Sequence, residues 1–196
     1  MAAGTNTGPL FSAIKKDHDE IFTYYDQYRK ATSLDEQTRW SNQLMWEVAR
    51  HSAGEEIVVY PLFEKHLGAD GKKMADHDRE DHQLVKNNLS KLEGMTVGSQ
   101  EYNALLQETM TNLREHAISE EQHDLPSLEN ALNRDESQAT ANSFQRTKKF
   151  VPTRAHPSAP DKPPFETLAG FLAAPMDKLK DAFSKFPTEE MKENVI

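Results

Sequence analysis

Two stretches of the chain, HSAGEEIVVYPLFE at 51–64 and HAISEEQHDLPSLE at 116–129, carry the same polar residues at the same spacing. In each, a histidine is followed by two adjacent glutamates, a proline and a final glutamate, and all five recur at an offset of 65 residues. A fixed internal period of this length indicates a duplicated structural unit. The duplication therefore sets the framework in which the rest of the sequence is interpreted.

A shorter pair of matching residues precedes each of these stretches. Asp17-His18 recurs as Asp81-His82, at an offset of 64 residues. Each half of the chain therefore has one segment with Asp-His and, about 33 residues further along the chain, a second segment with His-x3-Glu-Glu. We expect a duplicated helix pair whose halves are related by a pseudo-two-fold axis.

Apolar residues three and four positions apart predict that all four segments are helices. The predicted helices cover residues 10–30, 37–63, from about 76 with Asp76 as N-cap, and from about 100. The breaks at 31–35, 68–71 and 94–99 are short, and short connections place consecutive helices antiparallel. The predicted fold class is all-α, an up-down antiparallel four-helix bundle.

The composition changes after residue 135. Residues 1–135 hold 14 basic and 24 acidic side chains, whereas five of the ten prolines lie between Pro152 and Pro164. We therefore expect a bundle at 10–135, a Pro-rich linker at 136–164 and a C-terminal helical extension of two short amphipathic segments at 165–190. The extension is expected to dock on the bundle or on a second subunit, with binding of a protein partner or of a membrane surface as alternatives.

Polar residues interrupt the apolar stripe of each predicted helix. Residues four apart lie on one face of a helix, so each histidine of the longer repeat shares a face with the first of its two glutamates. An ionised carboxylate in an apolar core is costly unless it is paired or bound to metal, and no lysine or arginine lies on these stripes. We therefore predict a buried metal site with six ligands: His18, His51, Glu55, His82, His116 and Glu120.

The ligand types narrow the choice of metal. Imidazole and carboxylate without thiolate suit iron or manganese, and also zinc. A structural zinc site needs four ligands, and six exceed that number. Two carboxylates that can bridge, with two sets of imidazoles, suit a pair of metal ions. Proline follows each carboxylate by about a turn and ends or kinks the helix, so we expect solvent access at that end.

The overall composition excludes several classes of protein. The 196 residues contain no cysteine, which removes disulfide scaffolds, thiolate metal sites and thiol catalysis. A net charge of −9 argues against nucleic acid or an anionic membrane as the main partner. No run approaches the length of a membrane helix, and MAAGTNTGPLF lacks the features of a signal peptide. We therefore expect a cytoplasmic location.

These residues resemble the hemerythrin-like, or HHE, cation-binding domain over about residues 10–130. The resemblance lies in His18, His51-x3-Glu55, His82 and His116-x3-Glu120, and the chain is similar to long fungal members that have a C-terminal extension. It implies a non-haem di-iron centre of Fe–O–Fe or Fe–OH–Fe type, bridged by the two carboxylates, with manganese or zinc as alternatives. The oxygen carriers of this family have a His-x3-His pair on the third helix, but here Asp78 precedes His82 by four residues.

Several residues near the site have an open role. His77 precedes His82 by five residues and is expected to point away, whereas Asp78 is a candidate for the missing ligand. Glu56 and Glu121 are expected to lie behind the ligands or in solvent. Asp17 and Asp81 are candidates for acceptors that orient an imidazole. Tyr25 is a candidate for a hydrogen-bond donor to a bound oxygen species or for a redox relay. The expected non-ligands are His66, His123 and His156. Glu120-x2-His123 resembles half of a ferritin motif whose second half is absent.

The predicted function is to bind or reduce dioxygen, peroxide or nitric oxide at the di-iron centre. One alternative is a non-enzymatic module that responds to iron or buffers it. A weaker alternative is a di-iron oxygenase that acts on an organic substrate. The expected partners are a small diatomic or peroxide ligand and, through the extension, a second subunit or another protein.

Overall fold

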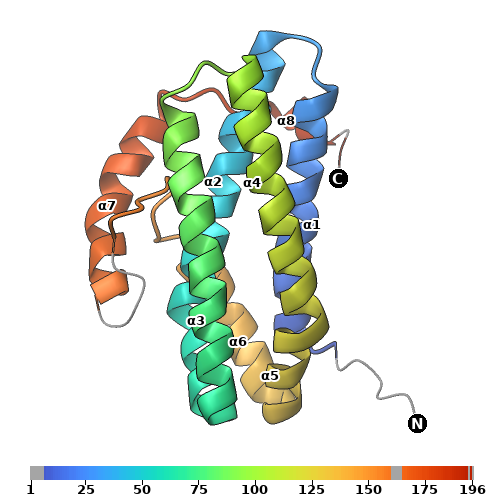
Figure 1. Ribbon diagram of the computed structural model, residues 1–196, viewed down its shortest axis with the longest axis vertical. Helices are drawn as coiled ribbons and strands as arrows, with labels where there is room; N and C mark the ends of the chain where they lie inside the picture. Colours follow the sequence, from blue (N-terminus) through green and yellow to red (C-terminus); the bar gives the residue numbers. More distant parts are fainter. Residues whose placement is uncertain (1–6, 160–164, 194, 196) are drawn as a thin grey trace.

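The computed structural model describes residues 7–159, 165–193 and 195, the side chains of 165–172 excepted. The described residues form an all-helical bundle in which four long helices lie side by side (Figure 1). The long helices are α1 (Pro9–Lys30), α2 (Leu34–Val58), α3 (Tyr60–Glu93) and α4 (Gln100–Ser119). They are followed by η1 (Glu120–Asp124), α5 (Leu125–Ala131), α6 (Arg134–Thr147), α7 (Phe165–Asp181) and α8 (Glu189–Glu193). The up-down order of the four long helices stays a prediction.

Local sequence explains where most of these helices begin. Ser33 accepts the backbone N–H of Glu36, whose carboxylate accepts the N–H of Ser33, so α2 starts with a capping box. The side chain of Ser99 caps α4 in a similar way. α1 begins with Pro9, whose missing N–H is unneeded at a helix start.

The predicted break around residue 68 is a single sharp reversal. Gly68 has φ 61° and ψ −130°, a conformation that favours glycine, and it interrupts α3. A Cβ on Gly71 would lie 1.9 Å from the carbonyl oxygen of Phe63, so the two parts of α3 approach closely here. The helix resumes directly after the reversal. The sequence predicted Asp76 as the N-cap of the third helix. That prediction is wrong, because Asp76 lies inside α3.

Residues 134–147 form helix α6 rather than the start of an extended linker. Asn133 and Glu136 form a capping box at its N-terminus. Its face with Ala141 and Phe144 is buried and packs across α1 and α2. The sequence analysis placed the start of the Pro-rich linker at residue 136, although the prolines begin only at Pro152, and it therefore missed this helix.

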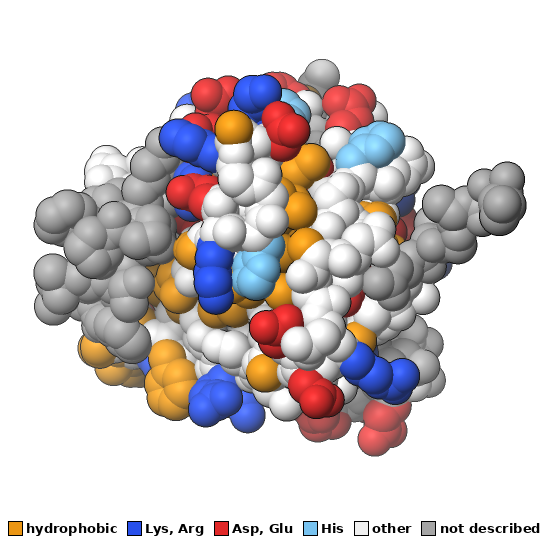
Figure 2. Space-filling view, turned by 90° about the horizontal axis from the view of Figure 1, so that it is seen from below, with side chains coloured by type: hydrophobic (Ala, Val, Ile, Leu, Met, Phe, Trp, Pro, Cys, Tyr) orange, Lys and Arg blue, Asp and Glu red, His pale blue; other side chains and the backbone are white. Residues whose placement is uncertain are grey.

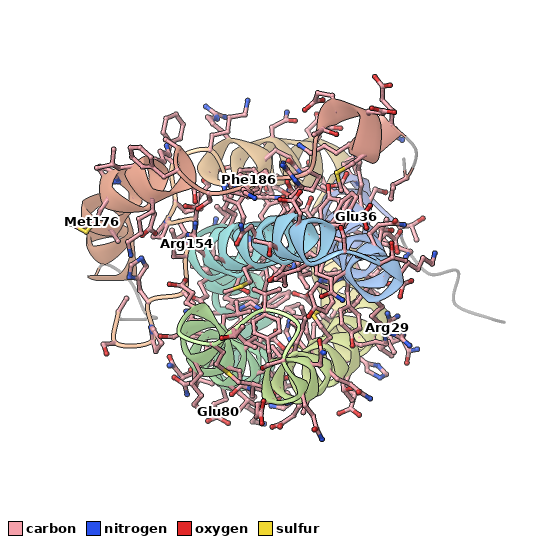
Figure 3. The ribbon with its side chains drawn as sticks, turned by 90° about the horizontal axis from the view of Figure 1, so that it is seen from above. Arg29, Glu36, Glu80, Arg154, Met176 and Phe186 are labelled. Atoms are coloured by element: carbon pink, nitrogen blue, oxygen red, sulfur yellow. The ribbon has the colours of Figure 1, made fainter. Side chains whose placement is uncertain are left out.

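The described part of the extension packs on the bundle along α2. Arg39 donates to the carbonyl of Phe186 at 2.7 Å, and Phe186 contacts Trp46 with ring centroids 6.3 Å apart. Figure 3 shows Met176 at the outer edge of α7, pointing away from the bundle, and Arg154 between α7 and the bundle. Within the described residues, no helix is both long and apolar enough to cross a lipid bilayer.

Candidate metal centre

A layer of polar side chains crosses the bundle between two separate apolar clusters. One cluster contains Ile21, Val48, Val85 and Leu113, and the other contains Ile14, Val59, Ala75 and Leu125. On each of the long helices, the chain passes from one cluster to the other through one histidine. This layer holds all six predicted ligands, which are at most 3% exposed.

Five of the six side chains form two donor groups that share one carboxylate. His18, His51 and Glu55 offer ligand atoms within 4.8 Å of one another, and so do Glu55, His82 and His116. Glu55 Oε2 lies 3.2 Å from His51 Nε2 and 3.4 Å from His82 Nε2. This carboxylate therefore stands between the two pairs of imidazoles.

The second glutamate lies beside the first histidine of the layer. Glu120 Oε2 lies 3.6 Å from His18 Nε2. The ring centroids of His18 and His51 are 4.7 Å apart, and those of His82 and His116 are 4.7 Å apart. The structure thus brings all the predicted ligand residues to one place, with the two halves of the repeat facing each other.

Most donor atoms at the centre of the layer lack a hydrogen-bond partner. These buried atoms are Nε2 of His18, His51 and His116, and both carboxylate oxygens of Glu55 and Glu120. Buried polar groups in native proteins are almost always paired, and an unpaired one costs about 1–3 kcal/mol. Converging unpaired nitrogen and oxygen donors fit a bound cation, so the residues present suit the metal that the sequence predicted.

Burial controls the charge of these groups. It raises the pKa of Glu55 well above the ordinary value, and the charges of Glu120 and Asp78 raise it further. Burial lowers the pKa of His51 to about 3. In the protein alone, the imidazole of His51 is therefore neutral at neutral pH, and burial favours the protonated form of Glu55. A cation at this place would instead favour the carboxylate form.

A carboxylate approaches the outward Nδ1 atom of every histidine in the layer. The pairs are Glu121 Oε1 and His18 at 2.9 Å, Glu56 Oε1 and His82 at 3.1 Å, Asp81 Oδ2 and His116 at 3.4 Å, and Asp17 Oδ2 and His51 at 3.5 Å. The Nδ1 atoms of His18 and His82 are hydrogen-bonded to their carboxylates, whereas those of His51 and His116 lie near Asp17 and Asp81 without a hydrogen bond. A carboxylate behind an imidazole can hold the tautomer that leaves Nε2 free for a metal. Glu56, Glu121, Asp17 and Asp81 thus lie behind the predicted ligands.

Other candidates lie away from the two donor groups. His77 points to solvent with its side chain 64% exposed, as its position on the helix predicted. Tyr25 is only partly buried and contacts Arg29, so its hydroxyl is not part of the layer. His123 is exposed, and His156 binds Asp177 at 2.8 Å.

Asp78 is buried at the edge of the layer. Its Oδ1 atom lies 3.7 Å from His116 Nδ1, and its Oδ2 atom has no hydrogen-bond partner. Burial and then the charge of Asp124 raise the pKa of Asp78 to about 8. Asp78 belongs to neither donor group, so its place as an extra ligand stays a hypothesis.

Sequence analysis gave no role at the site to three buried residues. The Tyr60 hydroxyl lies 3.1 Å from His82 Nε2, the Phe144 ring lies edge-on to His51 at 6.0 Å, and the Lys148 ammonium contacts Asp17. Tyr60 lies inside the 51–64 stretch, but its counterpart in 116–129 is Leu125, so the repeat gave no signal for it. Phe144 and Lys148 lie outside the repeat, in a segment whose packing no periodicity revealed.

The expected solvent access at the proline end of the site is absent from the described part of the structure. Pro61 and Pro126 do mark irregular backbone, because α2 ends just before Pro61 and η1 just before Pro126. However, the apolar cluster with Tyr60, Phe63 and Leu128 covers this side of the layer. From below, where α5 lies, charged side chains and histidines surround small apolar patches (Figure 2).

The fold and the site define a class of protein: a helical bundle with a buried histidine and carboxylate cation centre. Residues 10–128 match the hemerythrin HHE cation-binding domain, and the chain belongs to this family. It is 54% identical over 178 residues to an uncharacterized hemerythrin-like protein of Schizosaccharomyces pombe, which covers 91% of this chain and 88% of that protein. No solved structure matches the chain significantly.

Proposed function

We propose that the chain holds two non-haem iron ions and uses them to bind or reduce dioxygen, peroxide or nitric oxide. The observation that carries this proposal is the convergence of unpaired, fully buried Nε2 and carboxylate atoms from both halves of the repeat. His18 and His51 would hold one ion, and His82 and His116 the other. Glu55 and Glu120 would contribute to both.

The donor set supports iron over most other metals. Four imidazoles and two carboxylates without any thiolate suit iron or manganese, with zinc as a weaker fit. Glu55 belongs to both donor groups, which is the arrangement that two ions sharing a bridging carboxylate require. Two metal ions in such sites stand about 3.5–4 Å apart.

Bound iron would supply the one-electron chemistry that the side chains here lack. The protein contributes a dry environment, because apolar clusters lie on both sides of the layer. It also contributes the imidazoles of His18 and His82, which are hydrogen-bonded to carboxylates through Nδ1, and the Tyr60 hydroxyl as a nearby proton donor. The small exposure of all six donors favours a diatomic or peroxide ligand over an organic substrate.

A second candidate function is an iron-responsive or iron-buffering module. Phe144 of α6 contacts His51, so the centre touches the segment that follows the repeat and leads to the extension. Loss of metal would leave the buried donors unpaired and could loosen that contact. In this case the readout would be a change in shape rather than turnover.

Metal analysis with a visible spectrum tests the proposal. We expect the full chain to bind about two irons and to show an oxygen-to-iron charge-transfer band when oxidised. Glu55→Ala should lose most of the iron and the band. It should also lose the rapid consumption of peroxide, which stopped flow would measure in the iron-loaded protein.

His77→Ala is the matched control, since His77 is an exposed histidine on α3 near the site. It should keep the iron content, the band and the peroxide reaction. A colourless protein with one zinc per chain would overturn the di-iron proposal. An iron-loaded protein that reacts with no oxidant, but whose extension becomes protease-sensitive when iron is removed, would favour the responsive module.

A further inference from the structure

Lys148 is a buried cation placed next to the metal layer by α6. It is the residue directly after α6, and its side chain is 4% exposed. Arg50 donates from Nε to the Lys148 carbonyl oxygen at 2.7 Å, which ties this point of the chain to α2. The ammonium donates to Asp17 and, at 2.5 Å, to Glu47 Oε1.

The carboxylates around Lys148 resemble a cation site. Asp17, Glu20 and Glu47 offer oxygen atoms within 4.8 Å of one another, which is a spacing that could hold a metal ion. The Lys148 ammonium, however, binds two of the three. A cation of the chain itself thus compensates the buried negative charge, so we assign no further metal to this cluster.

The same oxygen of Asp17 that binds Lys148 also faces the metal layer. Asp17 Oδ2 accepts from the ammonium and lies 3.5 Å from His51 Nδ1. A carboxylate held between a fixed cation and an imidazole has little freedom to turn away. Lys148, Asp17 and His51 therefore form a chain of contacts that leads from the end of α6 to the ring that faces Glu55.

The aspartate behind His116 in the other half of the repeat is placed differently. Asp81 corresponds to Asp17, but its side chain is 35% exposed. Its basic neighbour is the surface residue His77, whose Nε2 atom is 3.9 Å away. The duplicated stretch ends at Glu129 in α5, so α6 lies outside the repeat. The two halves of the layer are therefore held differently, and only the His51 side depends on the segment after the repeat.

We propose that Lys148 is a positioning residue of the metal centre, and this inference rests on the proposed function. Its ammonium holds Asp17 3.5 Å from His51 Nδ1, where the carboxylate can accept a hydrogen bond from Nδ1–H and keep Nε2 directed at Glu55. Carboxylates behind ligating histidines affect metal affinity about 10- to 100-fold. Lys148 acts on the metal ligand His51 through Asp17, so the position of α6 affects the metal site.

Nitrogen-15 NMR of the histidine rings tests the proposal in the full chain. In the metal-free wild type, His51 should carry its proton on Nδ1. Lys148→Met should move the nitrogen signals of His51 and leave those of His82 and His116 in place. Lys148→Arg, which keeps the charge, should restore the wild-type pattern in large part. A zinc titration should give about 10- to 100-fold weaker binding to Lys148→Met.

Lys86→Met is the matched control. Lys86 Nζ binds Glu56 Oε2 at 2.6 Å, and Glu56 contacts His82 Nδ1, so this variant removes a lysine at the corresponding place behind a different histidine. It should move the signals of His82 and leave those of His51. A role of Lys148 in folding alone would lower the melting temperature without this selectivity.

Three results would overturn the proposal. The first is a His51 protonated on Nε2 in the wild type, which decides the matter even where Lys148→Met does not fold. The second is an unchanged His51 spectrum in folded Lys148→Met, and the third is an equal change at all four histidines. A wild type that binds neither iron nor zinc would refute the proposed function, whereas the metal-free spectra would still report on the contact from Lys148 through Asp17 to His51.

Discussion

Tyr60 shows how one side chain can respond to metal at this centre. Its hydroxyl lies 3.1 Å from His82 Nε2, while Glu56 lies 3.1 Å from His82 Nδ1. If Glu56 accepts a hydrogen bond from the Nδ1–H group of His82, then Nε2 of the same ring is an acceptor, and the Tyr60 hydroxyl donates to it. Burial raises the pKa of Tyr60 well above its ordinary value, so the hydroxyl keeps its proton. A metal on His82 would compete for the same lone pair.

Tyr60→Phe should therefore affect the metal-free and metal-loaded proteins differently. Without metal, loss of this buried hydrogen bond should lower the free energy of unfolding by about 1 kcal/mol. With metal, the bond is already lost, so the change should be smaller. By linkage, the variant should bind metal about fivefold more tightly, as a zinc titration followed by chemical denaturation would measure. Weaker metal binding in Tyr60→Phe would show that the hydroxyl instead supports the loaded state.

At the scale of the element, the irregular helices around the two carboxylates have a common cause. α2 ends at Val58 just after Glu55, and the π-helix η1 begins at Glu120. Pro61 and Pro126 follow, and proline cannot donate the backbone hydrogen bond that a continuous α-helix needs. Such π-helical turns occur often at functional sites. Here the irregular backbone follows each carboxylate directly, at Val59 after Glu55 and in η1 from Glu120 onward.

Gly54 shows how closely α6 approaches α2. A Cβ at this position would lie 2.8 Å from Phe144 Cε2 and 3.3 Å from Lys148 Cγ. Helix propensity alone would make alanine about 1 kcal/mol better than glycine. The fully buried Phe144 ring leaves no room, so Gly54→Ala should instead destabilise the protein by about 1–2 kcal/mol.

Chemical denaturation measures this effect, and Gly94→Ala provides the control. Gly94 lies at the end of α3 with φ −89°, and a Cβ there would meet only Lys91 O at 3.5 Å. Gly94→Ala should change the stability by less than about 0.5 kcal/mol. An unchanged or higher stability of Gly54→Ala would mean that α6 can move away from α2 at little cost.

At the scale of the whole molecule, a small polar cluster joins the extension to the rest of the chain. Asp177 is fully buried on α7 and accepts the backbone N–H groups of Thr153 and Arg154. It also binds His156 Nε2 at 2.8 Å. Arg154 in turn binds Asp181 at 2.9 Å. These contacts hold α7 to the irregular segment that follows α6.

The docking of α7 should depend on pH through His156. The hydrogen bond to Asp177 raises the pKa of His156, with Glu93 adding to this effect and Lys180 opposing it. The charged form is therefore favoured in the folded state. Its contribution is complete below the unfolded pKa of about 6.5 and is lost as pH rises through the higher folded value.

Wild type and His156→Gln should accordingly differ most below pH 6.5 and converge at high pH. The melting temperature and the rate of proteolysis between α6 and α7, measured from pH 5.5 to 9, would test this. His123→Gln is a suitable control because His123 is exposed. A difference between wild type and His156→Gln that stays constant over the whole pH range would refute the role of the charge.

The sequence by itself determined the helical class and the duplication, and it predicted the six candidate ligands that the structure brings together. The reason is that residues four apart on a helix share a face, so local spacing alone places a histidine and a glutamate together. The same geometry predicted that His77 would point away from His82. Interactions of this kind need no knowledge of how distant segments pack.

Only the tertiary structure decided what surrounds the donors. The contact of Lys148 with Asp17 joins residues 131 positions apart, and Phe144 meets His51 because α6 crosses α1 and α2. The closing of the proline end by an apolar cluster is likewise a matter of packing between helices. Such contacts depend on the mutual placement of separate elements, which a single sequence does not encode in any local period.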